Sequence, residues 1–198
     1  PKKEDGRGVS VVDAATGKLI WKIGQTTYHV GDGMVADFDP SHPGMECFAS
    51  EDRKGGSTDK YLLTATGKKI NTTNAEVPGC RNWIWWDADL LRETFKGDDN
   101  RWGASSSSGG RKQSIWKWQG EVLTEGIEGD ILMIADLEGD WREELITALP
   151  GELRIYHTNI PARDRRVTLM QDPLYPSYVA HRSMGYPQSP VPSFYLGE

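Results

Sequence analysis

A short strand, a tight turn that contains glycine and a second strand recur along this chain. The pattern begins at Val9, Lys60 and Ser114, and its turn glycines Gly17, Gly67 and Gly120 lie about 50 residues apart. A fourth strand pair is expected around Gly151. Alternating segments repeated at this spacing are typical of propeller blades, whereas a helical repeat needs a different periodicity. The sequence therefore predicts an all-β fold, a β-propeller of which this chain holds about four blades.

Composition argues against several other classes of protein. The 198 residues carry 29 acidic and 23 basic side chains, a net charge of −6, which does not favour binding to nucleic acid or to a membrane surface. No apolar run approaches the roughly 20 residues that cross a bilayer. The two cysteines, Cys47 and Cys80, allow at most one disulfide, and we predict that Cys47 is a buried free thiol because apolar residues lie next to it.

Acidic residues gather where apolar strands end, in three segments between the predicted hairpins. Calcium takes about six to eight oxygen ligands, which alternate carboxylates in a turning loop can supply. A plain solvated turn explains any one of these segments alone, but their recurrence favours a metal role. The candidate calcium ligands are Asp37, Asp39 and Glu46 in the first segment, Asp87 and Asp89 in the second, and Asp136, Glu143 and Glu144 in the third.

Other features have simpler interpretations. Trp83, Trp85 and Trp86 are expected to pack in the core, although tryptophan at a pore mouth also stacks on sugars. Residues 103–111 read as a surface loop, and the proline-rich segment from Pro173 to the end lacks regular periodicity.

Several strings of the chain resemble a known family. The segments VADFDPSHPGMECFAS, WIWWDADLLRE, IADLEGDWREELI and LRIYHTNIPARDRRVTLMQDPLY are similar to the C-terminal half of family 11 rhamnogalacturonan lyases. The resemblance implies an eight-bladed β-propeller that binds calcium, with its active site in the central cleft. It also implies a secreted or periplasmic enzyme that cleaves rhamnogalacturonan I, an acidic plant cell-wall polysaccharide, between rhamnose and galacturonate by β-elimination.

On this interpretation residues 1–198 form the C-terminal half of a single catalytic propeller. Half a propeller leaves two sheet faces uncovered, so the N-terminal half of the same protein is the expected partner. The opening PKKEDGRGV runs straight into a strand pattern, which also indicates that the natural chain starts upstream.

The chain departs from the family where basic residues are thought to serve the reaction. Asp32 stands in a VGDG turn where the family has arginine, and Glu128 aligns with a family lysine, whereas the family's tyrosine is kept as Tyr186. We therefore expect Tyr186 and His181 to transfer protons and Arg182 to bind the substrate carboxylate.

Two alternatives stay open at this stage. Asp32 and Glu128, with His29 as a further candidate, could be the acid and base of a glycoside hydrolase built on the same scaffold. A propeller that only binds acidic glycans, without catalysis, is the other.

Overall fold

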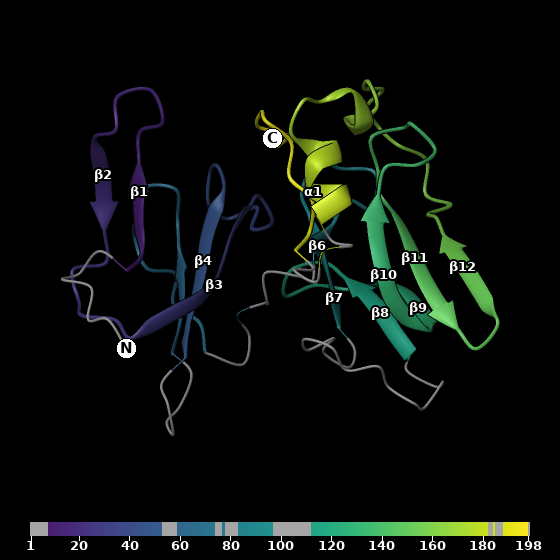
Figure 1. Cartoon of the computed structure of the whole chain (residues 1–198), viewed down its shortest axis with the longest axis horizontal. Helices are drawn as coiled ribbons and strands as arrows, with labels where there is room; N and C mark the ends of the chain where they lie inside the picture. The colour runs from purple at the N-terminus through teal and green to yellow at the C-terminus, as the bar shows by residue number, and fades with distance from the viewer. Residues whose placement is uncertain are drawn as a thin grey trace. The chain divides into compact units, whose positions relative to one another are not determined.

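The computed structural model describes residues 8–52, 59–73, 77, 83–96, 112–181, 184 and 188–197 (Figure 1). The chain divides into two compact units, Pro1–Cys80 and Arg81–Glu198. Twelve strands, one short 3-10 helix and one seven-residue α-helix make up the described residues, so the predicted all-β class is confirmed. Neither helix has the length or apolar character of a membrane span.

The first unit contains a two-stranded and a three-stranded antiparallel sheet. The hairpin of β1 (Ser10–Val12) and β2 (Leu19–Lys22) forms the first, and β3 (His29–Ala36), β4 (Glu46–Asp52) and β5 (Asp59–Leu63) form the second. A core of Val9, Cys47, Ala49, Tyr61 and Leu63 is packed against Val11, Trp21, Ile23 and Val30. Cys47 is a buried free cysteine, as predicted, and Cys80 lies outside the described residues.

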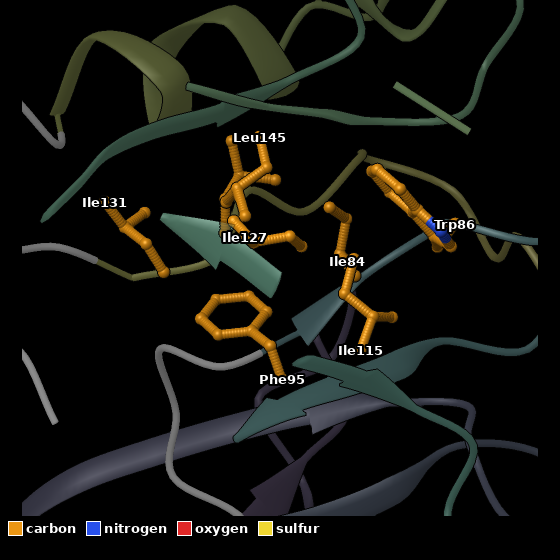
Figure 2. Packing of buried hydrophobic residues seen from close by; sticks show 8 residues of the cluster. Ile84, Trp86, Phe95, Ile115, Ile127, Ile131 and Leu145 are labelled. Carbon is orange, nitrogen blue, oxygen red and sulfur yellow. The ribbon is translucent and has the colours of Figure 1, made fainter. Parts of the chain in front are cut away.

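The second unit contains a four-stranded and a three-stranded antiparallel sheet. The first sheet has the order β6 (Trp83–Ile84), β7 (Glu93–Lys96), β8 (Lys112–Trp116) and β9 (Val122–Glu128). The second comprises β10 (Asp130–Ala135), β11 (Glu144–Leu149) and β12 (Glu152–Tyr156). Figure 2 shows the apolar core that both sheets share, built from Ile84, Trp86, Phe95, Ile115, Ile127, Ile131, Ile134 and Leu145.

The predicted hairpins around Gly17, Gly120 and Gly151 are confirmed as β1–β2, β8–β9 and β11–β12. The hairpin expected around Gly67 is shorter, because after β5 only the bridge between Leu63 and Lys69 forms. Gly67 itself is required there. Its φ is +83°, and a Cβ would lie 2.7 Å from the ring of Trp21, which donates from Nε1 to the carbonyl of Ala65.

Only one described sheet has the four strands that are typical of a propeller blade. Beyond β12 the chain leaves the sheet, and Pro161 lacks the N–H that a continuing inner strand would need. One face of this sheet carries Leu153 and Ile155, which are 69% and 60% exposed beside their cross-strand neighbours Ala148 and Ile146. An apolar sheet face is therefore left open in the second unit.

The proline-rich C-terminal segment is more regular than its sequence indicates. It forms α1 (Tyr175–His181), which follows the short η1 (Leu169–Gln171), and Asp172 Oδ1 caps the start of α1 by accepting from the N–H groups of Leu174 and Tyr175. Leu169, Tyr175 and Val179 pack into a second core with Trp85, Leu90, Ala135, Trp141 and Leu196. This core places the C-terminal segment against the turns that follow β6 and β10.

Candidate metal loops and the buried network around Arg92

Three acidic loops have the same construction. The first (residues 37–45) follows β3, the second (85–92) follows β6, and the third (136–143) follows β10. In each case the glutamate that opens the next strand turns its Oε2 back and accepts two backbone N–H groups of the loop. Glu46 accepts from Phe38 and Asp39, both at 3.1 Å; Glu93 from Trp86 and Asp87 at 2.8 and 3.4 Å; and Glu144 from Leu137 and Glu138 at 2.6 and 3.0 Å.

These hydrogen bonds define which loop positions correspond. Trp85 stands where the first and third loops have Asp37 and Asp136, and Asp87 corresponds to Asp39. The second loop therefore lacks the first carboxylate of the other two.

The closing glutamates are buried among other acids. Burial raises the pKa of Glu46 to about 7, and nearby Asp37 and Asp39 add to the effect against the two hydrogen bonds. Burial likewise raises the pKa of Glu144 to about 7 and holds that of Glu93 well above its ordinary value. A carboxylate in such surroundings favours a proton or a cation beside it.

The first loop has an oxygen that fits a metal ligand. Glu46 is 1% exposed, and its Oε1 has no hydrogen-bond partner within the described part of the chain. Asp39 already has two side-chain partners: its Oδ1 accepts from Ser41 Oγ, and its Oδ2 lies 2.9 Å from His42 Nδ1. A buried, unpartnered carboxylate oxygen near further carboxylates matches the all-oxygen ligand sets of calcium.

In the second loop the ammonium group of a lysine lies among the carboxylates. Asp87, Asp89 and Glu93 offer carboxylate oxygens that all lie within 4.8 Å of one another, the only such group among the described residues. Lys117, from the β8–β9 turn, places its Nζ 2.6 Å from Asp87 and 2.7 Å from Asp89. Burial opposes its charge, but these two hydrogen bonds outweigh that and raise the pKa of Lys117. Neither Glu93 nor Lys117 was predicted from the sequence. The only sequence signal for Glu93 is its place at the end of the loop, where the other two loops also have a glutamate.

The third loop is tied to the C-terminal segment. Asp136 Oδ2 accepts from Thr168 Oγ1 at 2.8 Å and from the N–H of Leu169 at 2.7 Å, while Oδ1 accepts from the N–H of Gly139. Glu144 faces the same loop, but Glu143 does not. Of the three predicted ligands in this segment, the structure thus brings Asp136 and Glu144 to the loop and directs Glu143 elsewhere.

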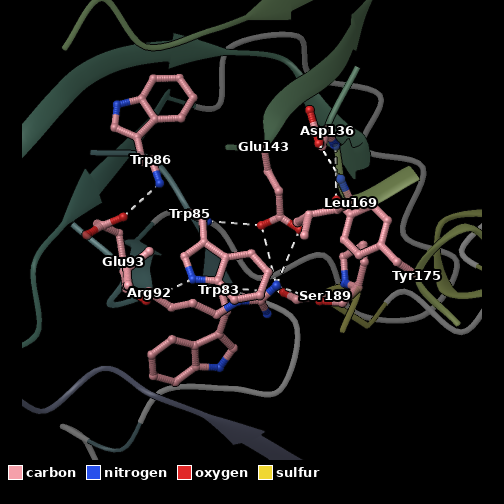
Figure 3. A network of polar contacts seen from close by, with 12 residues as sticks. Trp83, Trp85, Trp86, Arg92, Glu93, Asp136, Glu143, Leu169, Tyr175 and Ser189 are labelled. Carbon is pink, nitrogen blue, oxygen red and sulfur yellow. Dashed lines mark hydrogen bonds and ion pairs between the residues drawn. The ribbon is translucent and has the colours of Figure 1, made fainter. Parts of the chain in front are cut away.

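Glu143 lies in a buried network that joins the second loop, the third loop and α1 (Figure 3). Its Oε1 accepts from Arg92 Nη2 at 3.3 Å and from the Tyr175 hydroxyl at 2.9 Å, and its Oε2 accepts from the N–H of Trp85 at 3.0 Å. The Arg92 guanidinium stacks 3.7 Å from the Trp85 ring centre and donates to the carbonyl of Pro190. Burial raises the pKa of Glu143, and the Arg92 charge opposes that rise.

The predicted catalytic residues are only partly described. His181 is the exposed last residue of α1, and Arg182 and Tyr186 lie outside the described residues. His29 begins β3 and is exposed, and Asp32 is half-buried on the same strand. Glu128 ends β9 in the other unit, where its Oε2 lies 2.6 Å from Arg154 Nη1. Asp32 and Glu128 therefore come from different units.

Comparison with known proteins identifies the class. The family model described as "Rhamnogalacturonan lyase family 11, C-terminal domain" matches residues 1–198, and the chain belongs to this family. It is 40% identical over 194 residues to rhamnogalacturonan endolyase YesW of Bacillus subtilis (strain 168), covering 96% of this chain and 29% of that protein. It is 35% identical over 202 residues to rhamnogalacturonan exolyase YesX of the same strain, covering 96% and 32%.

Solved structures show the same likeness. The exotype rhamnogalacturonan lyase YesX superposes with a TM-score of 0.74 at 34% identity, covering 96% of this chain and 32% of that one. The Bacillus licheniformis rhamnogalacturonan lyase PL11 gives 0.70 at 33% identity, covering 98% and 31%. The chain thus spans about a third of the length of these relatives.

Proposed function

We propose that the protein to which this chain belongs is a polysaccharide lyase that cleaves rhamnogalacturonan I. The observation that carries the proposal is family membership along the whole chain, together with relatives named as rhamnogalacturonan lyases. The substrate is then an acidic plant cell-wall polysaccharide. Because such a polymer lies outside cells, we propose a secreted or periplasmic enzyme.

The architecture proposed for the domain is a β-propeller, of which residues 1–198 form the C-terminal half. Successive antiparallel sheets built from strands in chain order support this arrangement. The open apolar face at Leu153 and Ile155 supports a partner that covers it, and the length of the relatives leaves room for that partner in the same protein. The N-terminal part of the propeller is the proposed occupant.

Calcium is the proposed cofactor, held by Asp37, Asp39 and Glu46 in the first loop and by Asp136 and Glu144 in the third. Glu46 Oε1, which has no hydrogen-bond partner among the described residues, and the raised pKa values of both glutamates support a hard cation in these two loops. In the second loop the ammonium of Lys117 already pairs with both Asp87 and Asp89 and takes the place of a bound cation, so no metal is proposed at that loop.

In β-elimination a base removes the proton on carbon five of galacturonate, a carbon–carbon double bond forms, and the bond from carbon four to the rhamnosyl oxygen breaks. Arg182 is the proposed partner of the uronate carboxylate, where its positive charge stabilises the enolate-like transition state. Tyr186 and His181 are the proposed groups that take this proton and protonate the leaving oxygen. A bound cation supplies further charge stabilisation at the carboxylate.

The test is the activity of the full-length protein on rhamnogalacturonan I, followed by the ultraviolet absorbance of the unsaturated uronate product. Elimination creates that chromophore, and hydrolysis does not. New reducing ends without the chromophore would instead identify a hydrolase, and no turnover would leave a binding protein. Product length then separates endo from exo cleavage, the two modes named among the relatives.

A further inference from the structure

Three arginines stand close together in the segment that connects β12 with η1. Arg163, Arg165 and Arg166 are all exposed, with Asp164 the only acid among them, in a chain whose net charge is −6. No ion pair or hydrogen bond joins their guanidinium groups to another residue in the described part of the chain. A concentrated positive segment on an acidic protein is suited to an anionic partner.

The other described arginines are used differently. Each has a carboxylate partner inside the protein: Arg92 with Glu143, Arg142 with Asp140, and Arg154 with Glu128 and Glu152. Arg163, Arg165 and Arg166 therefore differ from the other described arginines in that no described carboxylate pairs with them.

The segment is fixed at several points, so its arginines project from an ordered support. The N–H of Arg163 donates to the carbonyl of Ala88 at 3.2 Å, within the second acidic loop. The carbonyl of Asp164 accepts from Trp141 Nε1 at 2.9 Å, and Trp141 is fully buried in the third loop. Thr168 and Leu169 bind Asp136 just beyond. Preorganised donors lose less conformational entropy on binding.

From these observations we infer that Arg163, Arg165 and Arg166 form a binding subsite for the carboxylates of a uronate-containing polysaccharide. A guanidinium binds a carboxylate through two parallel hydrogen bonds, and a polymer that repeats its carboxylates can engage several guanidinium groups at once. The choice of uronate over other anions rests on the proposed function. The subsite lies against the second and third acidic loops. It would bind uronate units of the substrate that are not at the bond that is cleaved.

The experiment measures binding of the full-length protein to an oligogalacturonate, which contains no rhamnose and so offers no bond of the proposed cleavage type. The triple variant R163Q/R165Q/R166Q removes three exposed charges of the subsite. The matched control, K18Q/K68Q/K69Q, removes three exposed lysine charges from the first unit. We expect the arginine variant to raise Kd by about tenfold or more and the lysine variant to change it by less than about twofold.

A second variant, R163K/R165K/R166K, keeps the charge but loses the bidentate geometry, and we expect it to bind with intermediate affinity. A carboxyl-reduced, neutral oligosaccharide should show no difference between any of the variants. An unchanged Kd in the glutamine variant would overturn the inference. Equal arginine dependence with polyphosphate would also overturn it, since the segment would then be a general anion patch.

Melting curves of each variant separate binding from folding, and the single variants R163Q, R165Q and R166Q replace the triple if it does not fold. A lower melting temperature with unchanged glycan binding would show that the arginines contact the rest of the protein instead, which is contrary to the inference. Turnover on rhamnogalacturonan I is measured in parallel. Arginine-dependent binding without an unsaturated product would refute the proposed lyase activity and support the subsite. Normal turnover with binding that does not depend on the arginines would support the lyase activity and refute the subsite.

Discussion

Arg92 and Glu143, which lie 51 residues apart in the sequence, face each other in the interior of the second unit. Their side chains are 2% and 0% exposed and 3.3 Å apart, and each immediately precedes the glutamate that closes its loop. The pair therefore ties the second acidic loop to the third. Tyr175 extends the same tie to α1 through its hydrogen bond to Glu143.

Breaking this pair should destabilise the fold strongly. Either R92M or E143Q leaves one buried charge or polar group without its partner, so we expect the free energy of unfolding to fall by about 3–5 kcal/mol. The double variant should lose less than the sum of the two. Urea denaturation measures all three, and R154Q, at a solvent-accessible ion pair, is the control expected to cost much less than either buried variant. Similar losses for R92M and R154Q would show that the buried pair has no special role.

Stability without metal should fall as the pH rises from about 4.5 to 7. Below this window Glu46 and Glu144 are protonated in both the folded and the unfolded states; within it the unfolded chain ionises first, because burial raises the folded-state pKa of each to about 7. The free energy of unfolding should fall by on the order of 3 kcal/mol per carboxyl group across this window. Melting temperatures measured in chelator across this range check it. The variant E46Q/E144Q should show a flatter profile, and an unchanged profile in that variant would contradict the assignment.

Calcium should reverse that loss at neutral pH. A ligand that binds only the folded state raises the melting temperature by mass action, and ionised Glu46 and Glu144 are its proposed ligands. We expect added calcium to raise the melting temperature of the wild type and to have a much smaller effect on E46Q/E144Q. Magnesium serves as a comparison, because it demands a tighter octahedral shell. If chelator and calcium give the same melting curve, the loops do not bind the ion.

Lys117 should be the cation of the second loop. In K117M, Asp87, Asp89 and Glu93 would keep their mutual repulsion without a counter-ion, so the melting temperature measured in chelator should fall. Calcium should then stabilise this variant more than it stabilises the wild type. K117R, which keeps a positive charge, is the control. A K117M protein as stable as the wild type in chelator would show that the loop needs no cation.

The proton-transfer assignment predicts a large loss of turnover in Y186F and H181Q. Removing a general acid or base costs about a hundredfold to ten-thousandfold in rate, and Y186F removes only a hydroxyl group. Initial rates of unsaturated product on rhamnogalacturonan I measure it in the full-length protein. D32N and E128Q form the opposing pair, expected to be mild for a lyase and damaging for a hydrolase. Near-normal rates in Y186F and H181Q would place the catalytic residues in another part of the protein.

The sequence by itself determined the strand class, three of the four hairpins and the places where acids follow strands, because alternation and turn glycines act over a few residues. It did not determine which acids share a loop. Glu143 and Glu144 are neighbours, but adjacent side chains at the start of a strand point to opposite sides, so one enters the Arg92 network and the other closes the third loop. Lys117 reaches Asp89 across 28 residues, and Arg163 meets Ala88 across a longer span. Such contacts depend on the pairing of strands and the packing of the C-terminal segment, which only the tertiary structure decides.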